Sequence, residues 1–133
     1  MSAGLALVSV FVRDVARARA FYMEMLGLEP VAQLSSESFA FLKPASGSPI
    51  AIQDISMLPP GVAAEPGGFR LDFEVDDLDA TWNDWKAKGV EGLTEISDMG
   101  AGRVFFARDP EGNAIGVARL YDSVRALRQQ MGL

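Results

Sequence analysis

The hydrophobic and polar positions of this chain follow the same order of elements twice. Residues 5–12 alternate as in a strand with one buried face, and residues 15–26 place apolar side chains at helical spacing. Residues 69–75 repeat the alternating strand, and residues 78–88 repeat the amphipathic helix. A supersecondary unit that recurs in this way predicts two equivalent modules, each made of a strand, a helix and further strands.

Capping residues mark the expected starts of both helices. Each first strand closes on Val-x-Asp, so Asp14 and Asp77 stand at the N-cap position, where a carboxylate accepts from free backbone N–H groups. An aromatic residue, Tyr22 or Trp85, follows at the same distance from each Asp. This equivalence favours a core role for Trp85, and helical spacing favours the same role for Trp82.

Strand-like runs and turns fill the rest of each module. Further strands are expected at residues 30–34, 38–43, 49–54, 92–97, 103–108 and 114–120, and a final helix at 122–131 aligns Val124, Leu127 and Met131. Prolines and paired glycines prevent regular structure between the modules. The predicted boundaries are about 5–56 for module 1, 57–68 for a linker, 69–120 for module 2 and 121–133 for the C-terminal helix.

Length and composition exclude several classes of protein. A chain of 133 residues with 49% hydrophobic residues has the size and the core of one domain. The net charge of −6 and the lack of a basic stripe argue against nucleic acid as a partner. No apolar run is long enough for a membrane span and no signal-peptide pattern is present, so we expect a cytoplasmic protein without membrane association.

The chain contains no cysteine and no histidine. Disulfides, thiolate metal sites and cysteine nucleophiles are therefore excluded. The commonest metal ligand and the commonest general base are missing as well. Most of the usual catalytic sites cannot be built from these residues.

Six short motifs follow one another along nearly the whole chain. They are Val-Arg-Asp at 12–14, Ala-Phe-Tyr at 20–22, Leu-Gly-Leu at 26–28, Val-Asp-Asp-Leu at 75–78, Lys-Gly-Val at 88–90 and Phe-Ala-Arg-Asp-Pro-Glu-Gly-Asn at 106–113. Each alone is weak, but their order and spacing resemble the vicinal oxygen chelate superfamily. That superfamily includes glyoxalase I, extradiol dioxygenases, fosfomycin resistance proteins and bleomycin resistance proteins.

The resemblance implies an α+β fold of two βαβββ modules in tandem, whose curved mixed sheet forms an open cleft, often in a homodimer. In the metal-dependent members, four strand positions supply the metal ligands. Here the corresponding positions hold Leu7, Ala51, Arg70 and Gly116. Three of these side chains have no donor atom and the fourth is a cation, so we expect neither a metal nor another cofactor.

Arg70, Asp72 and Glu74 give the sharpest local signal for a binding site. They alternate with apolar residues and are therefore expected on the cleft side of their strand. There they would recognise a polar or charged group of a ligand, with Arg70 anchoring an anionic or carbonyl group. The alternative is that Arg70 only pairs with Asp72 or Glu74 on a solvated strand surface.

An apolar wall is expected to accompany that charged wall of the cleft. Its residues are Leu7, Ser9 and Phe11, and Phe39, Phe41 and Gln53 on neighbouring strands would join the lining if their strand phase points them the same way. Met57 and Met99 are expected at the mouth of the cleft, where flexible side chains could adapt to a ligand. Apolar walls with a few placed polar groups suit a drug-sized ligand. The alternative for the two methionines is an ordinary position in a surface loop, and the run 109–113 is expected to be a structural turn.

The predicted function is metal-independent binding of a small molecule, by sequestration in the manner of bleomycin resistance proteins. The negative charge would weakly favour a cationic or metal-chelating drug. The alternative is an enzyme, either a glyoxalase- or dioxygenase-like lyase or isomerase with atypical or absent metal ligands, or a cofactor-free catalyst with Asp72 or Glu74 as general base. A non-catalytic partner module that uses the C-terminal helix is a third hypothesis.

Overall fold

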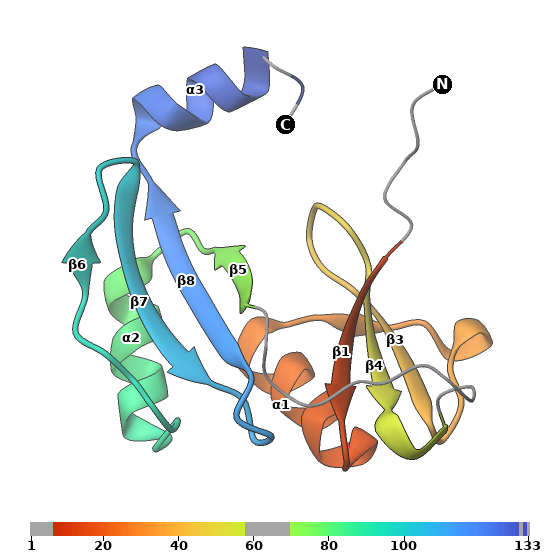
Figure 1. Cartoon of the computed structure of the whole chain (residues 1–133). Helices are drawn as coiled ribbons and strands as arrows, with labels where there is room; N and C mark the ends of the chain where they lie inside the picture. Colours follow the sequence, from red (N-terminus) through yellow and green to blue (C-terminus); the bar gives the residue numbers. More distant parts are fainter. Residues whose placement is uncertain (1–6, 58–69, 131, 133) are drawn as a thin grey trace. The chain divides into compact units, whose positions relative to one another are not determined.

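The computed structural model describes residues 7–57, 70–130 and Gly132. The chain divides into two units. Unit 1 comprises Met1–Gly68 and Pro110–Gly112, and unit 2 comprises Phe69–Asp109 and Asn113–Leu133. Each unit contains one four-stranded sheet, drawn in Figure 1.

Unit 1 is a βαβββ module. Its elements are β1 (Val8–Val12), α1 (Val15–Leu26), β2 (Glu29–Pro30), the 3-10 turn η1 (Ala32–Leu34), β3 (Phe39–Lys43), β4 (Ile50–Asp54) and the 3-10 turn η2 (Ile55–Met57). The strand order is β1-β4-β3-β2. β1 runs parallel to β4, whereas the other pairs are antiparallel, so the sheet is mixed.

Unit 2 repeats this arrangement and adds a helix. Its elements are β5 (Arg70–Glu74), α2 (Leu78–Ala87), β6 (Ser97–Asp98), β7 (Gly102–Arg108), β8 (Ala114–Leu120) and α3 (Asp122–Gln130). The strand order β5-β8-β7-β6, with β5 parallel to β8, is that of unit 1. The prediction of an α+β fold with two βαβββ modules and a C-terminal helix is therefore confirmed.

The two aspartates predicted as N-caps both cap their helices. An Oδ1 atom of Asp14 accepts from the backbone N–H of Arg17 at 3.0 Å, and Asp77 accepts from Ala80 at the same distance. Gly27 ends α1 with a φ of 67°, a left-handed conformation that glycine adopts without steric cost. Equal sequence patterns thus produce equal helix starts.

Each helix covers one face of its own sheet with an aromatic residue at the centre. Tyr22 of α1 and Trp85 of α2 are fully buried, and the ring of Trp85 meets Phe105 of β7 edge to face at 5.4 Å between centroids. The equivalence of Tyr22 and Trp85 is confirmed. Trp82 is only half-buried, and its Nε1–H donates to the Thr94 carbonyl at 2.8 Å, so it lies at the margin of the core.

The strand predicted at 30–34 is wrong for most of its length, because only Glu29–Pro30 pairs with β3. The chain then bends into η1. The Ser35 hydroxyl donates to the Val31 carbonyl at 2.8 Å and accepts from the Phe41 N–H at 3.0 Å. A side chain thus takes the place of a strand hydrogen bond, a local competition that alternation does not reveal.

The strand predicted at 92–97 is also wrong for most of its length, because the strand that pairs with β7 is only Ser97–Asp98. Gly92 has a φ of 67° and belongs to a turn. The Thr94 hydroxyl accepts a hydrogen bond from the backbone N–H of Phe106 at 2.9 Å, in place of a strand partner. The predicted linker, apart from Met57, and Met131 of the final helix lie outside the described residues.

The predicted turn at 109–113 is held together by its own polar side chains. Asp109 and Asn113 are buried, and the Asp109 carboxylate accepts from the Asn113 backbone N–H and from its side-chain Nδ2, both at 2.9 Å. These hydrogen bonds satisfy groups that would otherwise be costly to bury. They support the prediction that residues 109–113 form a turn with a structural role.

α3 continues from the end of β8 and lies beyond the strands of its sheet (Figure 1). None of its described residues is buried, and Leu127 exposes 54% of its surface. Arg125 connects the helix to β5 through Glu74, with Nε and Oε2 3.6 Å apart. Within the described residues, no helix combines the length and the apolar character needed to cross a membrane.

Candidate functional site

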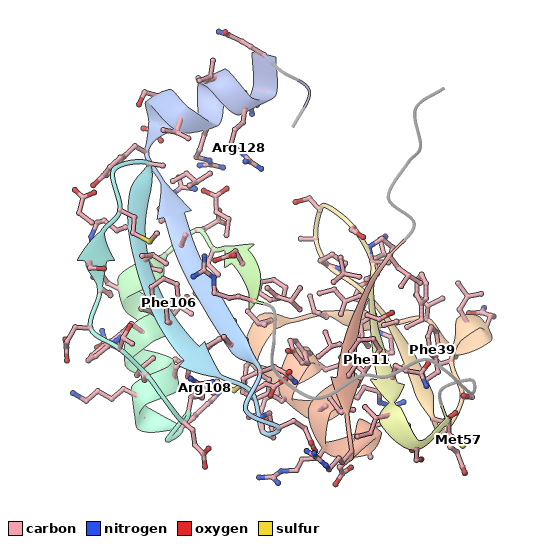
Figure 2. All side chains as sticks on the ribbon, in the orientation of Figure 1. Phe11, Phe39, Met57, Phe106, Arg108 and Arg128 are labelled. Atoms are coloured by element: carbon pink, nitrogen blue, oxygen red, sulfur yellow. The ribbon has the colours of Figure 1, made fainter. Side chains whose placement is uncertain are left out.

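The register of unit 2 gathers the predicted charged residues on the face of the sheet opposite α2, which we call helix-free face 2. The contact between Trp85 and Phe105 places α2 on the other side. Because paired residues share a face, the side chains of helix-free face 2 are those of Arg70, Asp72, Glu74, Ala114, Gly116, Ala118, Val104, Phe106 and Arg108. Phe106 and Arg108 are labelled in Figure 2.

Arg70 lies across this face between a carboxylate and an aromatic ring. Its Nε is 3.1 Å from Oδ1 of Asp72 and donates to Oδ2 at 3.2 Å. The guanidinium carbon lies 4.8 Å from the centroid of the Phe106 ring, within the range of a cation–π interaction. The pairing of Arg70 with Asp72, weighed above as one alternative, is thus present, and both side chains remain about half exposed.

Gly116 makes room for this arrangement. It is paired with Asp72 on β5 and with Phe106 on β7, so the three residues form one row across the sheet. A Cβ atom at position 116 would collide with Oδ1 of Asp72 and would lie 3.2 Å from its Cγ and 3.4 Å from Cε1 of Phe106. The space that a side chain of β8 would fill is therefore occupied by the Asp72 carboxylate.

Glu74 is on the same face but is engaged elsewhere. Its Oε2 accepts from the Leu120 N–H at 2.9 Å and lies 3.6 Å from Nε of Arg125 and 4.0 Å from Nη1 of Arg119. These contacts attach α3 to the end of β5 and β8. Of the three charged residues, Arg70 and Asp72 therefore form a pair, whereas Glu74 holds α3 in place.

Unit 1 has an equivalent face opposite α1, helix-free face 1, and its side chains are largely apolar. The register forms one row of Phe11, Gln53 and Phe39 and a second row of Ser9, Ala51 and Phe41. Phe11 and Phe39 are labelled in Figure 2. All of these residues are half-buried except the buried Ala51, and Leu7, also half-buried, immediately precedes β1. The register thus places Phe39, Phe41 and Gln53 on the same face as Phe11, which alternation alone could not decide.

The two methionines proposed for the cleft lie in connections between elements. Met57 ends η2 and exposes 63% of its surface, and Met99 lies between β6 and β7 and exposes 56%. Neither belongs to a strand of a helix-free face. Their positions agree with loop methionines, and their part in binding stays a prediction.

The positions that correspond to metal ligands do not fit a metal ion. Ala51 pairs with Ser9 and Gly116 with Asp72, so both lie on the helix-free faces of their units. Their side chains, like that of Leu7, contain no donor atom, and Arg70 is a cation already paired with a carboxylate. Among the described residues, no three acidic, histidine or cysteine side chains gather where they could hold a metal.

Other charged clusters of unit 2 lie away from helix-free face 2. Arg103 forms a bidentate pair with Asp79 of α2, both N···O distances being 3.1 Å, and these hydrogen bonds hold the pKa of Asp79 below its usual value. Asp98 accepts from the Gly100 N–H and the Tyr121 hydroxyl, which lowers its own pKa and raises that of Tyr121. These interactions fix the β6–β7 connection and the end of β8.

Sequence reasoning identified Arg70 and Asp72 but not the part played by Phe106. Phe106 stands within the motif that carried the resemblance, and alternation along β7 assigns it a face. What brings it to Arg70 is the register across β8, because Phe106 pairs with Gly116 and Gly116 with Asp72. A register between strands distant in sequence has no local signal.

Comparison with solved structures gives close matches over nearly the whole length. A protein from Agrobacterium tumefaciens solved by solution NMR is 27% identical with a TM-score of 0.74, the match covering 90% of this chain and 99% of that one. An antibiotic binding protein from a Streptomyces species is 26% identical with a TM-score of 0.71, covering 91% and 99%. A fosfomycin resistance protein from Listeria monocytogenes, at 22% identity and a TM-score of 0.70 over 94% and 99%, shares the fold.

Sequence comparison places these likenesses in one family. A search of curated proteins found no significant match. The family model described as Glyoxalase/Bleomycin resistance protein/Dioxygenase superfamily matches residues 4–117, which cover the first βαβββ module and the second as far as the middle of β8. The resemblance carried by the six motifs is thus confirmed, and the chain belongs to the glyoxalase/bleomycin resistance protein/dioxygenase superfamily.

Proposed function

We propose that this protein is a metal-independent small-molecule-binding protein of the bleomycin-resistance type, which sequesters a drug-like or metabolite ligand. The observation that carries the proposal is that the positions which hold metal ligands in the metal-dependent relatives have no metal-binding side chains here. At Gly116 the place of a ligand side chain is filled by Asp72, which is itself paired with Arg70. The residues that remain are suited to contact an organic molecule directly.

The chemistry of the two helix-free faces supports this proposal. Helix-free face 1 has half-buried aromatic side chains at Phe11 and Phe39 beside the polar Gln53. Helix-free face 2 has the Phe106 ring beside the ion pair of Arg70 and Asp72, so each face has apolar and polar groups of its own. Small-molecule sites combine apolar contact area with a few polar groups in fixed positions. The similarity to an antibiotic binding protein over nearly the full length of both chains agrees with this class of function.

The contacts of the two carboxylates weigh against the enzyme alternative. A general base must be within hydrogen-bond reach of the proton that it abstracts from the substrate, so its oxygens must not be engaged by other partners. Asp72 is paired with Arg70, and Glu74 accepts from Leu120 and lies close to Arg125. Ligand binding without turnover needs no such base.

We also propose that the protein forms a homodimer and that α3 takes part in the interface. α3 has no buried residue among those described, and Leu127 and Tyr121 expose 54% and 38% of their surfaces. Apolar side chains that one helix leaves exposed are available for a protein–protein contact. Association would remove it from water.

The metal-independence is tested by elemental analysis of protein purified without added metal and dialysed. We expect less than a stoichiometric amount of nickel, zinc, manganese or iron, because the positions of the ligands offer no set of donors. Addition of a chelator should leave the thermal midpoint unchanged, since no bound metal contributes to folding. Close to one metal ion per chain would contradict the proposal and favour an enzyme.

Binding itself is tested by a thermal-shift screen of small molecules on the dialysed protein. A ligand that binds only the native state raises the midpoint by an amount that grows with its concentration. Mass spectrometry of the recovered ligand should then find it unaltered. A ligand that is chemically converted would contradict sequestration.

A further inference from the structure

We infer that Arg70 binds a carboxylate group of the ligand through its two terminal nitrogens, and that Asp72, Phe106 and Gly116 position it for this task. The inference rests on the proposed function, because it assigns the ligand chemistry of helix-free face 2. Nothing in the family membership requires it, since this position supplies a metal ligand in the metal-dependent relatives.

The hydrogen bonds of Arg70 leave one side of its guanidinium available. An arginine carries five N–H donors in a rigid, planar fork. The Nε–H is directed to Asp72, at 3.1 and 3.2 Å from the two carboxylate oxygens. Toward the other residues that the structure describes, Nη1 and Nη2 form no hydrogen bond or ion pair. The outer edge of the fork can therefore bind a group from solution.

The guanidinium lies over the ring of Phe106. The guanidinium carbon is 4.8 Å from the ring centroid, within the range of a cation–π interaction. Together with the hydrogen bond to Asp72, this contact restricts a side chain that would otherwise lose much rotational freedom on binding. A fork that is already oriented binds a planar partner with a smaller entropic cost.

Gly116 is the third element of this arrangement, since a side chain there would displace the Asp72 carboxylate. The four residues come from three adjacent strands, β5, β8 and β7, and their strand register is fixed by the sheet. Sites built on strands hold their geometry better than sites built on loops. The positioning of Arg70 is thus part of the fold of unit 2.

The charges around Arg70 favour a carboxylate over a phosphate. A carboxylate matches the two parallel donors of the fork and brings a single negative charge. Asp72 already neutralises part of the cation, Glu74 lies on the same face, and the chain has a net charge of −6. Each of these charges repels a phosphate dianion more strongly than a carboxylate.

The test is an NMR titration with benzoate, its uncharged analogue benzamide and inorganic phosphate as probes. The readouts are the Nε–H signal of Arg70 and the dissociation constant of each probe. We expect benzoate to shift this signal and to bind more tightly than either benzamide or phosphate. Arg70→Ala should weaken benzoate binding by about tenfold or more, the range of a lost charge-assisted pair.

Two further variants separate geometry from charge. Arg70→Lys keeps the charge but lacks the fork, so we expect it to lose most of the benzoate affinity. Phe106→Leu keeps an apolar side chain but removes the ring. It should move the Arg70 Nε–H signal in the free protein, because the ring no longer lies against the guanidinium, and it should weaken benzoate binding by a few-fold.

Arg103→Ala is the matched control. Arg103 also pairs with a carboxylate of unit 2, its side-chain exposure of 44% is close to the 45% of Arg70, and it lies on the side of α2. This variant should bind benzoate as the wild type does. A loss equal to that of Arg70→Ala would overturn the inference by pointing to general destabilisation.

The remaining outcomes distinguish this inference from the proposed function. Equal benzoate affinity in wild type and Arg70→Ala would overturn the carboxylate assignment, whereas a screened ligand that still binds both proteins would leave the proposed function intact. Full retention of affinity in Arg70→Lys, or tighter binding of phosphate than of benzoate, would also overturn the assignment. Bound metal in the purified protein would contradict the proposed function without changing the result of the titration.

Discussion

Gly102 and Gly116 lie on neighbouring strands of unit 2, and in each case the missing side chain makes room for a different neighbour. At Gly102 a Cβ atom would collide with the carbonyl oxygen of Arg119 and lie 2.8 Å from Cα of Leu120. At Gly116 it would collide with the Asp72 carboxylate, the far end of a flexible side chain. Backbone cannot move out of the way without disturbing the sheet, whereas a half-exposed side chain can rotate.

We therefore predict opposite consequences for the same substitution at these two positions. Gly102→Ala should lower the free energy of unfolding by about 1–3 kcal/mol, the usual cost of forcing extra atoms into a packed site. Gly116→Ala should stay within about 1 kcal/mol of wild type, because only a surface side chain has to move. Urea denaturation of the two variants measures both values, and equal losses would contradict the argument.

At the scale of single residues, the sequence predicts two of the four residues of the candidate site. Alternation along 69–75 puts Arg70 and Asp72 on one face, and the structure agrees. The involvement of Phe106 and the space at Gly116 depend on which residues of three strands stand opposite each other. That register results from packing of the whole sheet, so no local pattern contains it.

At the scale of elements, capping residues and helical spacing were reliable, and strand edges were not. α1 begins at Val15 and α2 at Leu78, each directly after its capping Asp. Two predicted strands proved much shorter, because Ser35 and Thr94 use their hydroxyl groups to satisfy backbone N–H groups of β3 and β7. Alternating hydrophobicity describes which face is buried, but it does not show where a side chain replaces a ladder bond.

The equivalent caps allow a direct comparison of the two modules. Asp14→Ala and Asp77→Ala should each lower the free energy of unfolding by about 1 kcal/mol, the typical cost of losing an N-cap. The two losses should be similar, because both carboxylates accept a backbone N–H at 3.0 Å. The measurement is chemical denaturation monitored by circular dichroism.

Asp76→Ala is the control for this comparison. Asp76 precedes Asp77 and is fully exposed, and toward the described part of the chain it forms only a 3.8 Å ion pair with Arg119. Exposed pairs of this length contribute little, so this variant should leave the stability nearly unchanged. A large effect at Asp76, or none at either cap, would show that capping does not determine the stability of these helices.

At the scale of the whole molecule, the net charge affects how ligands approach, and the exposed apolar surface affects whether two copies associate. The charge of −6 slows the approach of anionic molecules, which makes the local orientation of Arg70 more important for a carboxylate ligand. Leu127 and Tyr121 expose apolar surface at and near α3. Burial of that surface between two copies is the reason to expect a dimer.

We predict that sedimentation at tens of micromolar reports a homodimer and that Leu127→Glu shifts the population toward monomer, because a carboxylate is costly to bury in an apolar interface. Leu34→Glu is a suitable control, since Leu34 is exposed to 55% in η1, almost the same as the 54% of Leu127. It should leave the sedimentation coefficient unchanged. A monomeric wild-type protein at this concentration would contradict the prediction.

The parallel pairing of the first and last strands of each unit has a consequence for synthesis on the ribosome. Val8 pairs with Ile50 and Arg70 with Ala114, so the earliest strand of each module waits for its partner until nearly the whole module has been translated. All strand pairs of the first sheet are nevertheless complete by Asp54. The nascent chain can thus close this sheet while most of the second module is still being made, and its hydrophobic strands are shielded early from the aggregation that threatens unpaired edges.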